Sequence, residues 1–192
     1  GARLEVKLLG PLEARVEGVL VDQWVRRKAQ LVLAALALYP RGLALPELGE
    51  LMGGEDAKPT ALKVAISYLR HALEPALAKG APSAYVVLEH ERYRLVADAA
   101  TVDVRAFEAA LDAGDLAGAL AIYRGNLLDE PFFHKFFEAE REQLRGRAVA
   151  AALQLAAGQR AAGDLAGAEA QLARMAAIAQ TDEAPYQALM DL

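Results

Sequence analysis

Cysteine is absent from the 192-residue chain. Its absence excludes disulfide bonds, thiolate metal sites and thiol nucleophiles, and it fits a reducing compartment. Long hydrophobic runs are also missing: the longest, Leu31–Tyr39, is far shorter than the ~20 residues that a membrane-spanning helix needs. The N-terminus lacks the basic segment leading into an apolar one that marks a secretory signal. We therefore expect a cytoplasmic protein with no membrane partner.

The sequence also has few residue patterns that are typical of catalytic sites. The histidines His71, His90 and His134 are far apart and have no second ligand at the spacing of a metal site. The loop at Gly53-Gly54 lacks the Gly-Lys-Ser/Thr tripeptide of a phosphate-binding loop. Paired carboxylates such as Asp129-Glu130 are better explained as helix caps than as an acid and a base. We expect a protein that is not an enzyme, with no cofactor and no bound metal.

Apolar sequence, in contrast, is abundant. Hydrophobic residues make up 55% of the chain, which is enough for a core in each of two small domains. The net charge of −5 is unevenly divided, since residues 1–98 hold 13 Lys/Arg against 12 Asp/Glu and residues 99–192 hold 8 against 14. An anionic partner would therefore meet the first half.

Strands and helices follow one another in the first half. Residues 3–9 alternate polar and apolar side chains, and shorter alternations over 12–21 predict a small antiparallel sheet. A mostly buried helix is predicted from Trp24 to Tyr39, and a short second helix from Pro46 to about Met52.

A third helix is the central element of the first half. Pro59 suits a first helical position, the apolar residues between Leu62 and Leu73 recur at helical spacing, and Pro75 should end the helix. Residues 84–96 then predict two short strands joined by a polar tip, which is a hairpin. This order of elements is typical of a winged helix-turn-helix domain.

After residue 98 the chain becomes alanine-rich and predicts helices alone, with no further strand. The segment Ala113–Leu120 recurs almost unchanged as Ala162–Glu169, with a glycine to end one helix and an aspartate to cap the next. Long helices are predicted over Phe133–Ala161 and Asp164–Ile178, and a last one is capped at Thr181-Asp182. Stacked helical hairpins of this kind are typical of tetratricopeptide-like domains.

Several segments together resemble the bacterial activators of the SARP type. Residues 65–73 (Ala-Ile-Ser-Tyr-Leu-Arg-His-Ala-Leu) and Tyr93-Arg94-Leu95 are similar to the DNA-binding domain of OmpR-like regulators. Residues 102–108 and 123–128 resemble the bacterial transcriptional activator domain. The resemblance implies an α+β winged helix-turn-helix domain at 1–98 and an all-α tetratricopeptide-like domain at 99–192, truncated at its C-terminal end because the family's last helices are missing.

The resemblance also implies double-stranded DNA as the partner. The contact positions it implies on the third helix, together with basic residues at the start of the first helix and in the hairpin, give the candidate contact residues. These are Arg26, Arg27, Thr60, Lys63, Val64, Ser67, Tyr68, Arg70, Arg92 and Arg94. The third helix would enter the major groove, Arg26 and Arg27 would contact phosphates, and the two wing arginines would reach the minor groove or backbone. Two alternatives stay open: a merely solvated helix face, and an ordinary hairpin tip whose carboxylates at Glu89 and Glu91 repel phosphates.

An aromatic cluster and the acidic second half leave the wider function open. The phenylalanines at 132, 133, 136 and 137 are interpreted as core, and the alternative is a docking surface for RNA polymerase or for a second protomer in a homodimer. We therefore carry two hypotheses. The first is a transcriptional activator that reads promoter repeats, and the second is a protein-protein interaction module whose winged domain binds DNA weakly or not at all.

Overall fold

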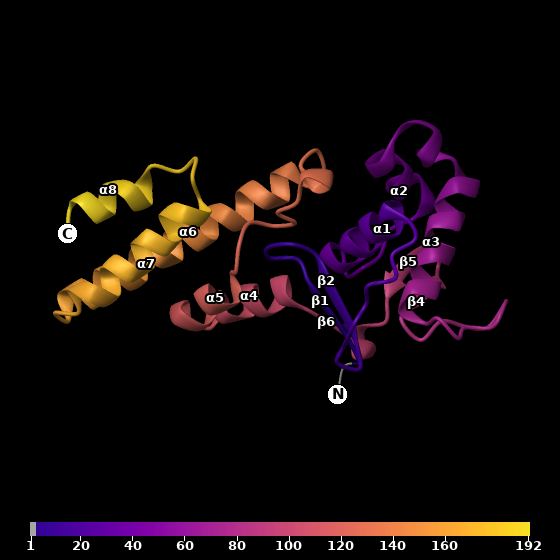
Figure 1. Ribbon diagram of the computed structural model, residues 1–192, viewed down its shortest axis with the longest axis horizontal. Helices are drawn as coiled ribbons and strands as arrows, with labels where there is room; N and C mark the ends of the chain where they lie inside the picture. Colours follow the sequence, from indigo (N-terminus) through magenta and orange to yellow (C-terminus); the bar gives the residue numbers. More distant parts are fainter. Residues whose placement is uncertain (1–2) are drawn as a thin grey trace. The chain divides into compact units, whose positions relative to one another are not determined.

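The computed structural model describes residues 3–192 and separates into two units (Figure 1). The first unit comprises Leu12–Val102 together with the chain before Leu9. The second comprises Asp103–Leu192 together with the short segment Leu9–Pro11. The sequence pattern changes between residues 98 and 99, whereas the internal contacts divide the chain a few residues later.

The first unit contains a four-stranded sheet. Its strands, in the spatial order β3-β2-β1-β6, are β1 (Leu4–Lys7), β2 (Glu13–Val16), β3 (Val19–Leu20) and β6 (Ala100–Val102). The strands β1 and β2 are antiparallel, with Leu4 opposite Val16, as the alternation predicts. The strand β6 runs parallel to β1, with Leu4 also opposite Ala100. The expectation of no strand after residue 98 is therefore wrong, because three residues are too few to show an alternation and their pairing is with a distant strand.

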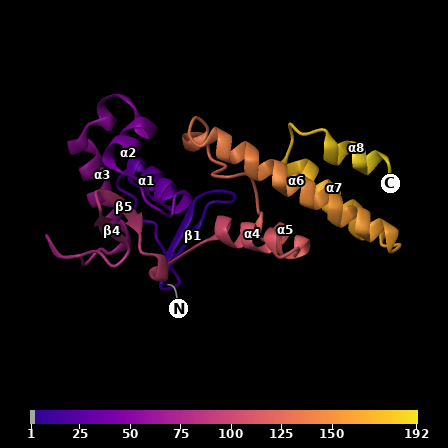
Figure 2. The same ribbon diagram turned by 180° about the vertical axis from the view of Figure 1, so that it is seen from behind.

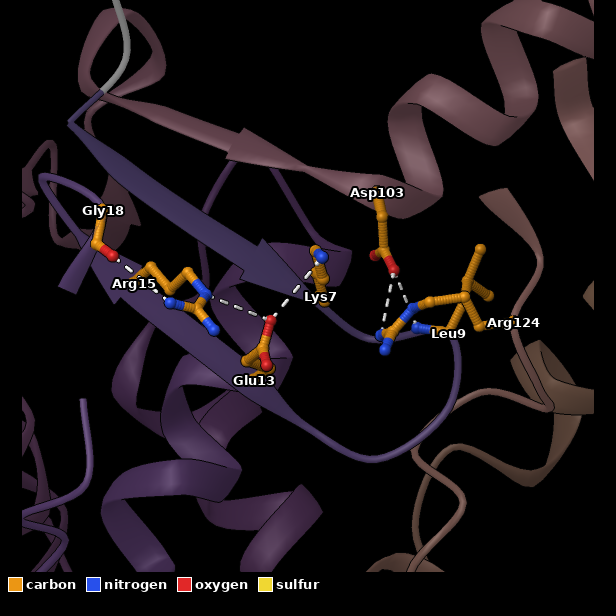
Figure 3. A network of polar contacts seen from close by, with 7 residues as sticks. All are labelled: Lys7, Leu9, Glu13, Arg15, Gly18, Asp103 and Arg124. Carbon is orange, nitrogen blue, oxygen red and sulfur yellow. Dashed lines mark hydrogen bonds and ion pairs between the residues drawn. The ribbon is translucent and has the colours of Figure 1, made fainter. Parts of the chain in front are cut away.

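Ion pairs between side chains lie on the surface of this sheet. Glu13 lies between two cations: its carboxylate is 3.6 Å from the Lys7 ammonium and 3.5 Å from Nε of Arg15 (Figure 3). Arg15 also donates a hydrogen bond to the carbonyl of Gly18 in the turn between β2 and β3. These pairs lie at the half-buried surface of the sheet and contribute little to stability, about 0–1 kcal/mol each.

Three helices follow the first three strands. They are α1 (Arg27–Leu38), α2 (Leu45–Met52) and α3 (Pro59–Leu73), with a 3₁₀ turn over Gly54–Ala57. Every residue from Ala29 to Ala37 is buried, so α1 is the central helix of the core. The predicted start of α1 at Trp24 is wrong: Arg26 has an extended backbone, and the Trp24 indole donates to the carbonyl of Val21 instead of joining the helix.

The predicted hairpin is present as β4 (Val86–Glu89) and β5 (Arg92–Leu95). Its two turn residues, His90 and Glu91, both have positive φ, which a two-residue type I′ turn requires. The β5 residue Tyr93 exchanges two backbone hydrogen bonds with Leu43, in the loop between α1 and α2. Gly42 makes this approach possible, because a Cβ there would lie 2.4 Å from the Tyr93 carbonyl oxygen.

The regular elements of the second unit, among its described residues, are helices joined by loops, and isolated backbone bridges pair Leu9 and Gly10 with Leu127. Its helices are α4 (Asp103–Asp112), α5 (Leu116–Ile122), α6 (Glu138–Ala161), α7 (Leu165–Ile178) and α8 (Ala184–Met190), with a 3₁₀ turn over Pro131–Phe133. The helices α6 and α7 lie side by side in both views (Figures 1 and 2). None of the helices between residues 3 and 192 combines the length and apolar character that a bilayer span requires.

The repeated segment forms the same turn twice. Asp115 accepts a hydrogen bond of 2.9 Å from the backbone N–H of Gly118, and Asp164 accepts one of 2.8 Å from Gly167. The preceding glycines, at positions 114 and 163, have φ of 76° and 84°. The predicted division of labour, with glycine ending one helix and aspartate capping the next, is confirmed at both sites.

The aromatic segment differs from its prediction. The long helix does not begin at Phe133, because Pro131–Phe133 form a 3₁₀ turn and Phe137 has φ of 57° immediately before α6. The side chains of Phe133, Phe136 and Phe137 are buried, so the core interpretation is confirmed for these three.

Backbone carbonyls of this loop are held by a side chain of α6. Arg141 donates through Nε to the carbonyl of Leu127 and through a terminal nitrogen to that of Phe133, at 2.8 and 3.1 Å. Burial lowers the pKa of Arg141, and the surrounding carboxylates oppose that shift. The guanidinium thus holds two backbone carbonyls of this irregular segment in place.

Candidate nucleic-acid interface

One face of α3 is exposed along its whole length. The opposite face packs into the core and consists of Leu62, Ala65, Ile66, Leu69 and Leu73, as the apolar spacing predicts. Each exposed position lies three or four residues from another, so together they form a continuous line on the helix surface. We call this line the α3 stripe; it consists of Thr60, Lys63, Val64, Ser67 and His71.

A cation is stacked beside the α3 stripe. The guanidinium of Arg26, in the extended residue before α1, lies 5.2 Å from the centroid of the Tyr68 ring. At this distance the ring attracts the cation and limits where its charge can lie. The structure thus brings Arg26 and Tyr68 together with Thr60 and Val64 around one shallow hollow of about 260 Å³.

A salt bridge lines the same hollow. The Lys28 ammonium pairs closely with the carboxylate of Asp56, which belongs to the 3₁₀ turn before α3. The neighbouring Arg27, the first residue of α1, donates to the side-chain oxygen of Gln30 at 2.7 Å. The three consecutive cations therefore have three different partners, and of the three only Arg26 stacks on α3.

Arg70 lies apart from the α3 stripe. Its Nε and a terminal nitrogen both donate to the carbonyl oxygen of Val86, at 3.2 and 3.1 Å, and its guanidinium lies 5.9 Å from the Tyr93 ring. These contacts tie α3 to the hairpin. Arg70 is half-buried there, so its first role in the structure is to hold two elements together.

Each arginine of the hairpin faces a carboxylate. Arg92 is 3.0 Å from Glu47 and also donates to the carbonyl of Gly42, while Arg94 is 2.7 Å from Glu89. The hydrogen bond and charge of Arg94 lower the pKa of the Glu89 carboxyl, which favours its ionised form. Much of the positive charge predicted for the wing is therefore balanced within the protein.

Sequence reasoning missed the partners of these cations. Glu47 lies on α2, where it also accepts from the backbone N–H of Ala44, and nothing in the local pattern connects it to Arg92, 45 positions along. The stacking of Arg26 on Tyr68 was equally hidden, because it depends on how α1 and α3 pack. The acidic pair Glu89 and Glu91 at the hairpin tip was the one feature of the sequence that indicated carboxylate partners for the hairpin arginines.

Within residues 3–192, no group of three His, Cys, Asp or Glu side chains could hold a metal ion.

Comparison with known proteins supplies a structural neighbour but no relative by sequence. No family model and no curated protein matches the chain. The solved structure of Mycobacterium tuberculosis EmbR in complex with a low affinity phosphopeptide matches with a TM-score of 0.74 and 24% sequence identity. The match covers 100% of this chain and 54% of the EmbR chain, so the chain spans about half of its neighbour's length. The chain therefore has an EmbR-like fold, in which a small sheet with helices is followed by a helical region.

Proposed function

We propose that this chain is a DNA-binding transcription regulator of the SARP type rather than an enzyme. In this proposal the first unit is a winged helix-turn-helix domain, α3 enters the major groove and the hairpin is the wing. The second unit is tetratricopeptide-like and contacts RNA polymerase or a second copy of the chain. The observation that carries the proposal is the α3 stripe, an exposed line of short side chains on a 15-residue helix with Lys63 on it and Arg26 beside it.

The electrostatics favour modest and salt-sensitive binding. Each phosphate neutralised by a cation releases counterions, so affinity falls as salt rises in proportion to the number of such contacts. Arg92 and Arg94 already pair with carboxylates, which leaves Arg26, Arg27 and Lys63 as the main cations of the proposed interface. Short polar groups such as the hydroxyls of Thr60 and Ser67 can bond to base edges or phosphates without a net charge.

Fluorescence anisotropy tests the proposal with a duplex selected by the full chain from a random pool. We expect Lys63→Ala to weaken binding and to reduce the slope of log affinity against log salt by about 1, the change for one lost phosphate contact. Lys7→Ala is the matched control, because it removes the same charge from a strand of the sheet. Equal affinities for both variants and the parent would exclude the α3 stripe as the DNA-binding face.

A second candidate function has its own support. The carboxylate partners of the hairpin arginines weaken the field of the wing, and the EmbR structure is that of a complex with a phosphopeptide. A protein-protein interaction module with little or no DNA binding would agree with both observations. Failure of the selection to enrich any duplex would favour this candidate over the regulator.

A further inference from the structure

A second shallow hollow lies beside the C-terminal half of the α3 stripe. Its volume is about 510 Å³. Ser67 and His71 of the stripe line one side of it, and residues 77–81, in the loop between α3 and β4, line the other. We call it the loop hollow. The hollow described above, which Thr60 and Val64 line, lies beside the N-terminal half of the same stripe.

The two hollows lie on opposite flanks of the α3 stripe. Successive residues of an α-helix are turned by about 100° around its axis. Ala61 and Tyr68, which line the hollow at Arg26, therefore lie on one flank, and Arg70, which lines the loop hollow, lies on the other. A helix in the major groove has a phosphate strand along each flank. With α3 in the groove, each hollow would face one of the two strands.

The loop beside the loop hollow is closed at its base by a carboxylate. One oxygen of Glu74, directly after α3, accepts hydrogen bonds from the Ser83 hydroxyl at 2.5 Å and from the backbone N–H of Ala84 at 2.9 Å. Glu74 is also the only acidic residue between positions 71 and 88 of the sequence. The two ends of the loop are thus held together within the protein, and the carboxylate of this segment is used at its base.

A lysine lies at the tip of the same loop. The backbone N–H of Ala81 donates to the carbonyl of Ala78 at 3.0 Å, which closes a turn around Lys79 and Gly80. The φ of Gly80 is 77°, as the third residue of a type II turn requires. Lys79 is exposed, and it is the only lysine or arginine between positions 71 and 88. The turn therefore presents one cation beside the second half of α3.

The loop hollow differs in charge from the hairpin. Each hairpin arginine faces a carboxylate, whereas the Arg70 guanidinium bonds to the carbonyl of Val86, a neutral group that leaves its positive charge unbalanced. Among the described residues that line the loop hollow, the charged ones are Arg70 and Lys79. The hollow therefore suits an anionic group with several acceptor oxygens, and a phosphate of the DNA backbone is such a group.

We propose that the loop hollow binds a phosphate of the DNA backbone through Lys79. The inference rests on the proposed function, because it needs α3 to enter the major groove. It adds to the interface a loop outside α3 and the hairpin, and it places a phosphate contact on the strand opposite the one that Arg26 would meet. A contact of this kind fixes the orientation of α3 on the duplex and carries no base preference of its own.

The test removes the charge of one phosphate at a time. A duplex selected by the full chain from a random pool is prepared with a neutral methylphosphonate at each backbone position in turn. At about 0.1 M salt the parent should lose about eightfold in affinity at the phosphate that meets Lys79, because one contact contributes about 0.9 to the slope of log affinity against log salt. Lys79→Ala should show this loss on the unmodified duplex and be indifferent to that methylphosphonate. Lys79→Arg, which keeps the charge, should behave as the parent.

Control variants separate a local contact from a general effect of charge. Lys7→Ala removes a lysine from β1 and should keep both the affinity and the methylphosphonate pattern of the parent. If Lys79→Ala keeps the pattern of the parent while Lys63→Ala weakens binding, or if Lys7→Ala weakens binding as much as Lys79→Ala, the inference is wrong and the proposed regulator stands. Absence of any selected duplex would overturn the proposed function, and the inference with it.

Discussion

The two copies of the repeated segment form the same turn but join helices of very different length. The first copy connects α4 and α5, of 10 and 7 residues, and the second connects α6 and α7, of 24 and 14 residues. Both aspartate caps and both glycines with positive φ are alike. The local sequence therefore determines the turn, whereas the length of the flanking helices depends on what they pack against.

The difference in helix length between the two hairpins begins at the C-terminal end of α5. Tyr123 leaves the helix after Ile122, is fully buried, and its ring lies 5.3 Å from that of Phe107. Its hydroxyl donates to Asn126, whose amide in turn donates to the carbonyl of Ile178, the last residue of α7. The exit of the first helical hairpin is thus bonded to the end of the second, and burial raises the pKa of the Tyr123 hydroxyl.

The largest expected effect comes from removing this anchor. Tyr123→Ala should lower the free energy of unfolding by about 3–5 kcal/mol, the usual cost of truncating a fully buried aromatic side chain. Urea denaturation followed by circular dichroism measures the change. Tyr186→Ala, at a tyrosine that is 45% exposed, is the control and should cost less than half as much. Equal losses in the two variants would show that the first hairpin does not depend on this anchor.

An intermediate effect tests whether the two turns are equivalent. At Gly118 and Gly167 an added Cβ would lie 2.0 and 2.1 Å from the capping carboxylate, so Gly→Ala at either position should expel the cap and cost about 1–2 kcal/mol. The midpoint temperature of thermal unfolding, measured for each of the two variants, reports the loss. Gly146→Ala, in the open middle of α6, should instead stabilise by about 0.5–1 kcal/mol. A large difference between the first two variants would contradict a turn determined by local sequence.

The smallest effect is expected when the cap is kept and its charge removed. Asparagine caps helices about as well as aspartate, so Asp115→Asn and Asp164→Asn should each change the free energy of unfolding by only a few tenths of a kcal/mol. Chemical denaturation of the two single variants and the double variant provides the measurement. A loss above about 1 kcal/mol in either would mean that the carboxylate charge, and not only its oxygen, stabilises that turn.

Much of the fold could be predicted because its signals are local. The bounds of α3, from Pro59 to Leu73, follow from a proline, a regular apolar spacing and a second proline. The helix caps at Asp115 and Asp164 follow from a Gly-Asp pair that occurs at both places in the sequence. The strand β6 and the 3₁₀ turn at Pro131 were missed, since a three-residue strand depends on a distant partner and a positive φ at Phe137 is not encoded by its own preference.

The candidate site was predictable only in part, for the same reason. The spacing along α3 predicts Thr60, Lys63, Ser67 and Arg70 on one face, and the first three of these are exposed there. Val64, which only the family resemblance suggests, is exposed beside them. The direction of a long side chain is a tertiary property, and Arg70 accordingly bonds to the hairpin rather than joining that face. Whether any of these residues contacts DNA stays a prediction.

Leu9–Pro11 belong to the second unit although the whole segment Leu12–Val102 of the first unit lies between them and Asp103 in the sequence. Leu9 donates its backbone N–H to Asp103, which also lies 4.0 Å from Arg124 (Figure 3), and Gly10 exchanges backbone hydrogen bonds with Asn126 and Asp129. On the ribosome these three residues must wait until more than a hundred later ones have emerged. Their final structure can therefore form only after Asp129 has been made, and the speed of translation up to Asp129 sets how long this segment remains without its partners.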